Sequence, residues 1–511
     1  MPPGVCDPVI CGTTAVTPLE GASLDATVAG GFIEHLSEGD VDRALRHFAR
    51  VLRAVGTLCM TPTEPAHWSG RWSGYVGERF PFFGGTRELH DHGANEMSQT
   101  PRPTSGQAEE SFHVAIAGLA LTEPLAQFLE GDTDSLPAGV GGASSVVWQL
   151  ASNLVSRGQH VSLVTLDQAV SASVTASGPL LNVVYGPHRP RHSMRDLMRV
   201  ERHAVRDGIL RTRPDLVHAH WCYEYALGAF ASGIPTLVTV HDWMPTILRL
   251  MEARYWPYWS GRLVLYFTVL ARAKYLTANS PYTADKVRPF TRASLEVVPN
   301  GVADGDFFIP GGQEALAQPR PACSPVIISV NNGFSPWKNV RRLLEAYRTL
   351  RQRGIECALE LIGDEYEPCG PCDAWARQRR LAEDVTFLGP LPRGEVLARM
   401  REATLLAHPA REESFGMTLI EAMSQRVPVI GGARSGAVPW VLGGGKAGML
   451  VDVDDPRALA QAMDAVLTHP ALMQRLASGG FRHAWDNFRQ SRVTDLYLDV
   501  YRRLLVEEAR R

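Results

Sequence analysis

The chain has 511 residues, more than one hydrophobic core usually organises, so we expect two or three domains. Hydrophobic residues make up 45% and charged residues 21%, as in ordinary soluble globular proteins, and a formal net charge of −3 gives no reason to expect a nucleic-acid partner. No apolar run reaches the ~18 residues of a membrane span, the N-terminus lacks the features of a secretory signal, and eight scattered cysteines fit a reducing compartment. We therefore expect a cytoplasmic protein.

Residues 1–110 are predicted to form a mostly helical or irregular N-terminal extension. Within 25–58, five apolar residues recur at helical spacing and predict one amphipathic helix: Val41, Leu45, Phe48, Leu52 and Val55. An aromatic stretch rich in glycine and proline follows, and its rings need burial. Two interpretations stay open: an extension that packs on the main body, or an arm that docks a partner or a second copy.

From Phe112 the pattern becomes strand, turn, helix and strand. The first strand is predicted at 112–119 and the second at 160–166, with a helix between them. The turn carries Gly141 and Gly142, where the backbone can approach a phosphate or a sugar closely. The loop before these glycines is longer than such turns usually are, which predicts a lid.

Two further strands are predicted at 216–219 and 236–240, and the second ends in His241 and Asp242. Open α/β sheets bind their ligands at the carboxyl ends of strands, so His241 is a candidate active-site residue; the alternative is a core histidine. The segment 249–262 is aromatic and basic. It could form an acceptor wall, touch a membrane surface or pack its rings under a loop.

The polar, proline-rich segment 310–325 is predicted to be an interdomain linker. A second series of strands and helices then begins with a strand at 326–330, followed by Asn332 and Lys338. The next strand, 359–362, ends in Gly363. Strands at 385–388 and 427–430 and helices over 458–484 and 491–508 complete the series.

The sequence HPAREESFGMTLIEAM at 408–423 combines a strand end, a helix start and two carboxylates. We expect Ser414 at the start of the helix, and Gly416 leaves the first N–H groups of that helix uncovered, which favours a phosphate. Glu413 and Glu421, with seven residues between them, bracket this anion site. Carboxylates accept hydrogen bonds from sugar diols, so the layout fits a diphosphate between a sugar and a ribose.

The segment ESFGMTLIEAM resembles the E-x7-E motif of the retaining GT-B glycosyltransferases, in particular family 4. The resemblance implies an α/β protein with two Rossmann-like domains that face a cleft, at 111–309 and 326–490. The segments 271–280 and 296–302 resemble the family's final strands of the first domain, and the helix at 491–511 would complete that domain.

The implied activity is the transfer of a sugar, of the hexosyltransferase type, from a nucleotide-sugar to an acceptor with retention of configuration. The acceptor could be a polysaccharide, a lipid-linked glycan or a small natural product, and peripheral contact with the inner face of a membrane is compatible with it. No metal or other cofactor is expected. Two alternatives stay open: an epimerase or phosphorylase on the same scaffold, or a non-catalytic sugar or nucleotide binder.

The resemblance assigns roles to matching positions. Glu421 would hold the ribose, Lys338 and the Gly416 helix end the diphosphate, and Glu413 the donor sugar. The implied catalytic residues are His241 and Glu413, and the implied donor-binding residues are Gly141, Gly142, Asn332, Lys338, Gly363, Phe415, Gly416 and Glu421. At two positions the chain departs from the family pattern. Asn331-Asn332 stands where a Gly-Arg pair is usual, and Trp440 replaces an acidic residue.

Two further motifs are weaker. CGPC at 369–372 matches a thioredoxin-type redox sequence, but without the surrounding strand order it is more simply an inert loop. Because no second CxxC exists, zinc is not expected. Asp132-Thr133-Asp134 matches a D-x-D metal motif, but it lies in a polar loop rather than at a strand end, so we predict no metal there.

Overall fold

The structure is a computed structural model and describes residues 111–139, 144–189, 191–250, 255–309 and 325–511. All of these lie within one compact unit, Leu58–Arg511. The predictions for the extension 1–110, for Gly141 and Gly142 and for the linker up to residue 324 fall outside the described residues.

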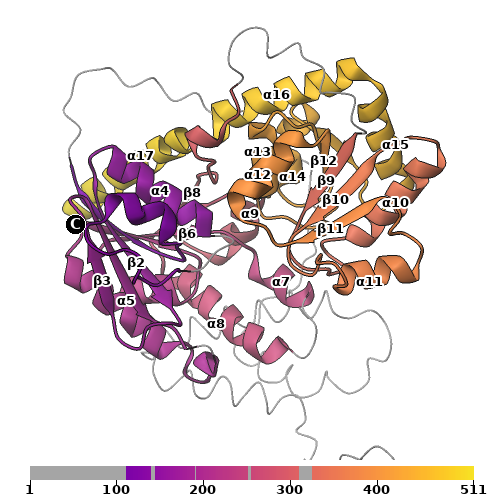
Figure 1. The fold of residues 1–511 in the computed structure, drawn as a ribbon. Coiled ribbons are helices and arrows are strands. Elements are labelled where there is room, and N and C mark those ends of the chain that lie inside the picture. Colours follow the sequence, from indigo (N-terminus) through magenta and orange to yellow (C-terminus); the bar gives the residue numbers. More distant parts are fainter. Residues whose placement is uncertain (1–110, 140–143, 190, 251–254, 310–324) are drawn as a thin grey trace, which may run out of the picture. The chain divides into compact units, whose positions relative to one another are not determined.

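The first half of the described chain builds an eight-stranded sheet in the order β3-β4-β2-β1-β5-β6-β7-β8 (Figure 1). All neighbouring strands pair in parallel except β3, which runs antiparallel to β4. The strands are β1 His113–Ala117, β2 His160–Asp167, β3 Val174–Ser177, β4 Leu181–Pro187, β5 Leu216–His220, β6 Thr236–Val240, β7 Tyr275–Ala278 and β8 Ser294–Val297. Most of them are buried on both faces, as is typical of strands between two helix layers.

The α-helices of this half are α4 Ser145–Ser156, α5 Arg199–Thr212, α6 Glu224–Ala231, α7 Met244–Leu250, α8 Trp256–Arg272 and α9 Pro281–Val287. In α4, Val147, Leu150 and Leu154 recur at helical spacing and are fully buried against β1 and β2. The loop predicted to be a lid holds a short 3-10 helix, Glu123–Phe128, and a bridge joins Leu121 to Gly139. Its role as a lid stays a prediction.

The second half builds an all-parallel sheet of six strands in the order β11-β10-β9-β12-β13-β14. The strands are β9 Val326–Val330, β10 Ala358–Ile362, β11 Val385–Gly389, β12 Leu405–Ala407, β13 Val429–Gly432 and β14 Met449–Val451. The helices are α10 Val340–Gln352, α11 Pro371–Gln378, α12 Arg393–Glu402, α13 Met417–Ser424, α14 Val438–Val441, α15 Pro456–Thr468, α16 Pro470–Phe488 and α17 Gln490–Ala509. Strands and helices alternate, as a doubly wound fold requires.

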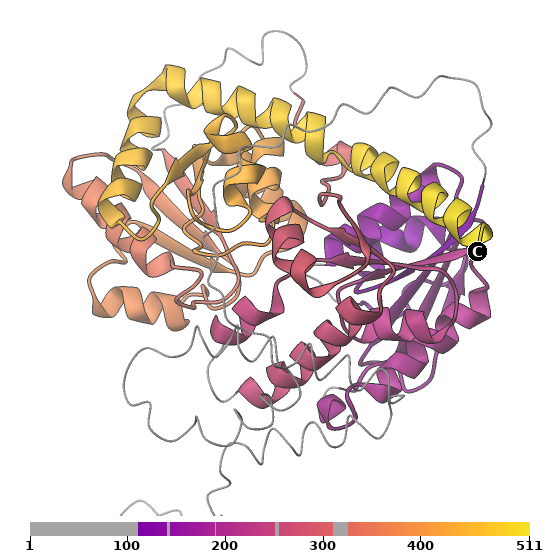
Figure 2. The ribbon, with the colours of Figure 1, turned by 180° about the vertical axis from the view of Figure 1, so that it is seen from behind.

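The last helix, α17, packs on the first sheet rather than on the second (Figure 2). Its apolar face joins the first core through buried Val493, Tyr497, Leu498 and Tyr501. The C-terminal segment therefore contributes to the core of the first half of the described chain.

The structure confirms the predicted fold class and revises some of the predicted elements. The helical stretch predicted at 458–484 is two helices, because Pro470 begins a new helix after α15. The helix of the E-x7-E segment begins at Met417 and not at Ser414. The second part of the aromatic segment 249–262 is the start of α8. Two strands of the first sheet, β3 and β4, and the edge strand β14 were not predicted.

Candidate functional site

Glu413 is the centre of a charged cluster between two loops. Its Oε1 lies 2.6 Å from Nζ of Lys338 and 3.4 Å from Nε2 of His408. Burial would raise the pKa of Glu413, but Lys338 and His408 outweigh it and lower the pKa to about 2. Glu413 is therefore a carboxylate throughout the physiological range. Both contacts go to Oε1, and Oε2 has no hydrogen-bond partner among the described residues, so it can accept from a ligand.

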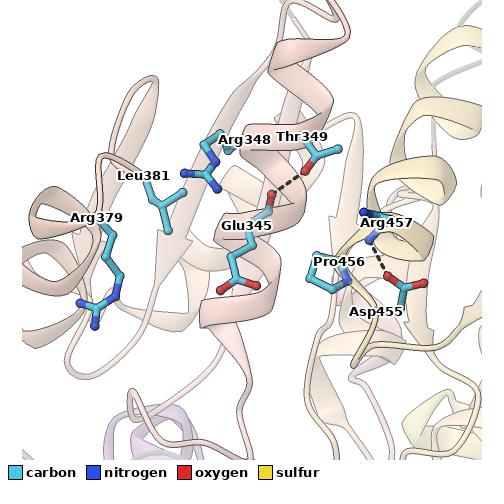
Figure 3. Close-up of a pocket in the computed structure, with 8 residues that line it drawn as sticks. All are labelled: Glu345, Arg348, Thr349, Arg379, Leu381, Asp455, Pro456 and Arg457. Atoms are coloured by element: carbon cyan, nitrogen blue, oxygen red, sulfur yellow. Dashed lines mark hydrogen bonds between the residues drawn. The ribbon is translucent and has the colours of Figure 1, made fainter.

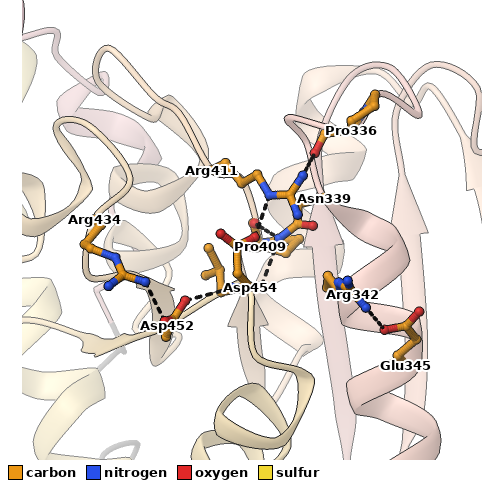
Figure 4. Close-up of polar contacts among 10 residues, drawn as sticks. Pro336, Asn339, Arg342, Glu345, Pro409, Arg411, Arg434, Asp452 and Asp454 are labelled. Carbon is orange, nitrogen blue, oxygen red and sulfur yellow. Dashed lines mark hydrogen bonds and ion pairs between the residues drawn. The ribbon is translucent and has the colours of Figure 1, made fainter. Parts of the chain in front are cut away.

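Backbone and side-chain contacts hold the loops of Lys338 and Glu413 together (Figure 4). The N–H of Arg411 donates to the Trp337 carbonyl over 2.8 Å, and its guanidinium lies 2.5 Å from Asp454. The amide of Asn339 donates to the carbonyls of Pro409 and Val453 at 3.1 and 2.9 Å. Since Asn339 is buried, these bonds fix the start of α10 to the end of β12 and so fix the distance between Lys338 and Glu413.

The start of α13 is open to a ligand. Gly416 is its N-cap, with a φ of 92° that a side chain would strain, and an added Cβ would lie 2.8 Å from Leu419 Cδ1. Within the described residues, the N–H groups of Met417 and Thr418 have no hydrogen-bond acceptor. These N–H groups and the helix dipole favour an anion beside Lys338. The side chain of Phe415 is buried against Trp440 and Phe488, so the predicted donor contact of this residue would come from its backbone.

Glu421 lies one turn further along α13 and is also buried. Its Oε1 is 3.5 Å from Nε of Arg393 at the start of α12, and Arg393 also lies 2.7 Å from Asp306. Burial raises the pKa of Glu421, and Arg393 only partly opposes this. Sequence reasoning missed Arg393, since no spacing connects it to the E-x7-E segment.

Asn332 and Gly363 meet where β9 and β10 end. The side-chain oxygen of Asn332 accepts from the N–H of Asp364 over 3.3 Å, so this residue holds the loop after β10. Gly363 has a φ of 130°, and an added Cβ would lie 1.7 Å from the carbonyl oxygen of Asn331. Here glycine is required for two strand ends to approach each other.

His241 lies at the end of β6, buried beside a second histidine. Its Nε2 is 2.9 Å from Nδ1 of His220, and the two rings stack with centroids 5.1 Å apart. Burial lowers the pKa of His241 to about 3, so its ring is neutral at pH 7. The neighbouring Asp242 accepts from the hydroxyl of Tyr223 over 3.0 Å, and burial raises its pKa to about 6.

Hydrogen bonds tie the E-x7-E loop to the first half of the chain. The hydroxyl of Ser280, the N-cap of α9, donates to the carbonyl of Ser414 over 2.6 Å. Tyr282 on α9 donates to the carboxylate of Glu412. Met417 packs against apolar residues of both halves. Ser414 therefore anchors the loop, which explains why the helix starts only after Gly416.

The D-x-D motif at 132–134 and Trp440 have structural contacts in the described part of the chain. Asp132 accepts from the N–H of Asp134 over 3.0 Å, a local turn. Among the described residues, no group of three or more His, Cys, Asp or Glu is placed to hold a metal ion. Trp440 is part of an aromatic cluster with Phe415 and Phe488.

The CGPC thiols differ in a way that does not favour redox chemistry. Cys372 is buried in α11 and burial raises its pKa to about 12, whereas Cys369 is exposed, and both are free thiols. Redox-active CxxC pairs instead contain a thiol whose pKa is lowered.

We expect a thiol-alkylating reagent to modify Cys369 in the native protein and to leave Cys372 unmodified until the chain unfolds. Peptide mass spectrometry after alkylation with and without denaturant measures both sites in one digest, with buried Cys222 as the internal control for protection. Equal native labelling of Cys369 and Cys372 would contradict the structural assignment.

A surface hollow of about 440 Å³ lies apart from these residues (Figure 3). It is lined by residues of α10, of the turn that follows α11 and of the start of α15: Glu345, Arg348, Thr349, Arg379, Leu381, Asp455, Pro456 and Arg457. None of the described residues predicted to bind the donor lines it. The candidate site is therefore the Glu413, Lys338 and α13 region, which its charges and uncovered N–H groups define.

Two family profiles match the two halves of the chain. The family described as glycosyltransferase family 4 matches residues 140–305, and the family described as glycosyl transferases group 1 matches residues 316–483. The second match contains Lys338, Gly363 and the whole E-x7-E segment.

Curated relatives match at moderate identity. A D-inositol 3-phosphate glycosyltransferase of Saccharomonospora viridis is 28% identical, over 78% of this chain and 96% of the relative. A protein of the same name from Salinispora arenicola is 30% identical, over 56% of this chain and 68% of the relative.

Solved structures share the fold. Sucrose-phosphate synthase of Thermosynechococcus elongatus aligns with a TM-score of 0.61 at 20% identity, over 78% of this chain and all of that one. HepE of Anabaena, solved in complex with UDP-glucose, aligns with a TM-score of 0.53 at 17% identity, over 76% of this chain and 99% of that one.

Proposed function

We propose that this chain, which belongs to glycosyltransferase family 4 (glycosyl transferases group 1), transfers a hexose from its nucleotide-sugar donor with retention of the anomeric configuration. Glycosyl transfer follows from the family; the hexose and the retention are the proposal. One observation carries it. Lys338 and the uncovered start of α13 lie beside the carboxylate of Glu413, whose Oε2 has no partner in the part of the chain that the structure describes, and Glu421 follows in the same short segment.

The ion pair between Lys338 and Glu413 suits a site for a sugar diphosphate. An ammonium group has three N–H donors, so Lys338 can keep Glu413 and still donate to a phosphate oxygen. The N–H groups of Met417 and Thr418 add a second source of positive potential. Together they stabilise the charge that grows on the departing nucleotide, the work that a metal ion performs in other transferases. We therefore propose that no metal is needed.

The anomeric configuration is retained if the acceptor attacks the anomeric carbon on the same face from which the phosphate departs. The bond between the anomeric carbon and the phosphate oxygen breaks, and the acceptor oxygen bonds to the same face of that carbon. The acceptor proton passes to the leaving phosphate oxygen, so no protein nucleophile is required. Glu413 Oε2 then orients the sugar by accepting from its hydroxyls, and His241 lies at the reacting carbon.

Glu421 is expected to be the main contact to the donor ribose, so Glu421→Ala should weaken donor binding at least tenfold. A thermal-shift screen with UDP-, GDP-, ADP- and dTDP-sugars measures this, starting with UDP-glucose. Saturation at ~100 times Kd stabilises the native state by about 2.7 kcal/mol, which is readable as a shift in Tm. One nucleotide should shift the wild type, and at the same concentration Glu421→Ala should keep about half of that shift or less, because tenfold weaker binding leaves about 1.4 kcal/mol of stabilisation.

Glu395→Ala is the matched control, because Glu395 is exposed on α12 in the same half of the chain. It should keep the full donor-dependent shift. The donor found in this way is then tested for transfer with and without a chelator, and the coupling constant of the anomeric proton reports the configuration of the product. D-inositol 3-phosphate is the first acceptor to try, because the relatives carry that name. Inversion, or activity lost to the chelator, would contradict the proposal.

The placement of the protein in the cell stays a prediction. No helix in the described ranges has the length and apolarity to cross a membrane. Trp256 and Tyr258, at the start of α8, are 47% and 40% exposed. Aromatic rings of this kind suit a membrane surface or an acceptor, and binding to lipid vesicles would separate these two uses.

A further inference from the structure

A buried chain of polar side chains connects His241 to the C-terminal helix. His218 and His220 are two residues apart on β5, so both point to the same face of the sheet, the face on which α17 packs. Nδ1 of His220 lies 2.9 Å from Nε2 of His241. The ring of His218 packs against that of His220 with centroids 4.2 Å apart.

His218 is fixed from two sides. Its Nδ1 is 2.6 Å from the hydroxyl of Tyr501 on α17, and its Nε2 is 2.6 Å from the hydroxyl of Thr239 on β6. Thr239 is in turn 2.6 Å from Thr277 and 3.2 Å from Tyr497. All of these side chains are at most 3% exposed. A chain of hydrogen bonds with so little access to water holds each ring in one orientation.

The three histidines are neutral at pH 7, since burial lowers the pKa of His218 and His241 to about 3 and that of His220 well below its usual value. A neutral imidazole carries one proton, so one ring of the His220 and His241 pair must donate to the other. If His241 donated, the proton of His220 would sit on Nε2. That atom is buried and has no acceptor among the described residues.

If His220 donates to His241 instead, the buried Nε2 of His220 carries no proton and is only an unused acceptor. A buried N–H without an acceptor is rarer and less favourable in proteins than an acceptor that is not fully used. His220 should therefore carry its proton on Nδ1 and donate it to His241. The proton of His241 is then left on its own Nδ1, which has no hydrogen-bond partner within the described part of the chain.

We propose that His220 is a positioning residue: its Nδ1–H donates to Nε2 of His241 and so presents the Nδ1–H of His241 as a hydrogen-bond donor to a hydroxyl of the donor sugar. Tyr501 and Thr239 hold His218, and His218 holds His220, so α17 contributes to the site although it touches no substrate. This inference rests on the proposed function for its catalytic consequence but not for the protonation state itself.

The protonation state is tested by NMR of the full chain labelled with 15N-histidine, because protonated and bare ring nitrogens have well-separated shifts. The His241→Gln variant identifies the His241 signals. We expect the wild type to carry the His241 proton on Nδ1. His220→Phe keeps the stacked ring but removes the donor. The preference of the His241 proton for Nδ1 should then weaken, and Nε2 should lose the 15N shift of a nitrogen that accepts a hydrogen bond. His220→Asn places an amide N–H where Nδ1 was, and should restore both the Nδ1 proton and the wild-type shift of Nε2.

The second test of the proposal measures the activity of the variants. His220→Phe should lower kcat about tenfold with little change in the KM of the donor, and His220→Asn should recover most of that loss. Tyr501→Phe removes one hydroxyl and should lower kcat about threefold. Tyr275→Phe is its matched control, because the Tyr275 hydroxyl donates to Glu508 at the far end of the same helix, 2.9 Å away. That variant should retain wild-type activity.

A wild-type His241 protonated on Nε2 would overturn the proposal, whatever reaction the chain performs. So would a His220→Asn variant as impaired as His220→Phe, because a loss that the retained N–H does not rescue is a packing defect. If no sugar is transferred by the wild type, the proposed function fails and the catalytic part of this proposal with it, while the NMR arm still decides the protonation state.

Discussion

Lys338→Ala is expected to lower kcat/KM for sugar transfer at least 100-fold and to destabilise the protein at the same time. The activity falls because the diphosphate loses its only charged N–H donor among the residues assigned to it, and the removal of one preorganised donor commonly costs about 10²–10³ in rate. Stability falls because the side chain of Glu413 is only 15% exposed and would remain buried without the cation that compensates its charge. Breaking a buried ion pair from one side typically costs about 3 kcal/mol or more.

The two effects of Lys338→Ala can be separated by a double variant. In Lys338→Met/Glu413→Gln both charges are removed and the volumes are nearly kept, so the Tm should return close to that of the wild type. The activity should stay low, because no charge faces the diphosphate. Steady-state kinetics and thermal unfolding of the single and double variants measure both quantities. If activity recovered together with Tm, Lys338 would be a structural residue and the phosphate assignment would be wrong.

The pH dependence of the same pair has a definite sign. The pKa of Glu413 is about 2 in the folded protein and near 4.5 when unfolded, so its contribution to stability is full above pH 4.5. That contribution is lost as the pH falls from 4.5 towards 2. Glu421 contributes in the opposite sense, because burial raises its pKa and the folded state favours the protonated carboxyl.

The strength of the sequence evidence depends on how local each contact is. The E-x7-E segment puts Glu413, Gly416 and Glu421 on one loop and one helix, so spacing alone predicted an anion site between two carboxylates. Lys338 follows a strand that lies next to β12 in the sheet, and its ammonium group lies 2.6 Å from Glu413. The role at the diphosphate that the resemblance to family 4 assigns to Lys338 stays a prediction. The fold class was confirmed for the same reason, since alternating strands and helices are a local pattern.

Contacts between distant segments left no such pattern. Arg393 reaches Glu421 from another helix, and Tyr501 reaches His218 across 283 residues of sequence. His218 and His220 have the spacing of two residues on one face of a strand, close to the end of that strand. This pattern alone does not predict a contact with His241, which only the structure shows, through the stacked rings of His220 and His241. Strand β3 was missed because it is short, mostly exposed and polar, and it is antiparallel to its neighbour.

Gly363→Ala is expected to be among the most destabilising single-methyl changes in the described part of the chain. An added Cβ would lie 1.7 Å from the carbonyl oxygen of Asn331 and 2.8 Å from the side-chain oxygen of Asn332. The first contact is with main chain, so a rotamer change cannot relieve it. The backbone at Gly363 is also held by its N–H, which donates to the Gly389 carbonyl over 2.9 Å. We expect a loss of more than about 4 kcal/mol, beyond the range of most substitutions.

Gly354→Ala provides the matched control for that loss. Gly354 also has a positive φ, 81°, and follows α10 in the same half of the chain, but an added Cβ would meet nothing within 4 Å. It should cost only the strain of the left-handed conformation, roughly 1–2 kcal/mol. Thermal unfolding of the two variants therefore separates backbone strain from the clash at the end of β10.

The same clash should also disturb the donor site, because Asn331, which the added methyl group would displace, directly precedes Asn332 and the loop of Lys338 in the chain. Displacing Asn331 shifts Asn332 and the loop that carries Lys338, whereas Gly354 lies at the opposite end of α10. In donor-binding assays below the Tm of each variant, Gly354→Ala should bind the donor as the wild type does and Gly363→Ala should bind it more weakly. Equal stability losses in the two variants would show that the ends of β9 and β10 can separate freely, and Gly363 would then be a replaceable loop glycine.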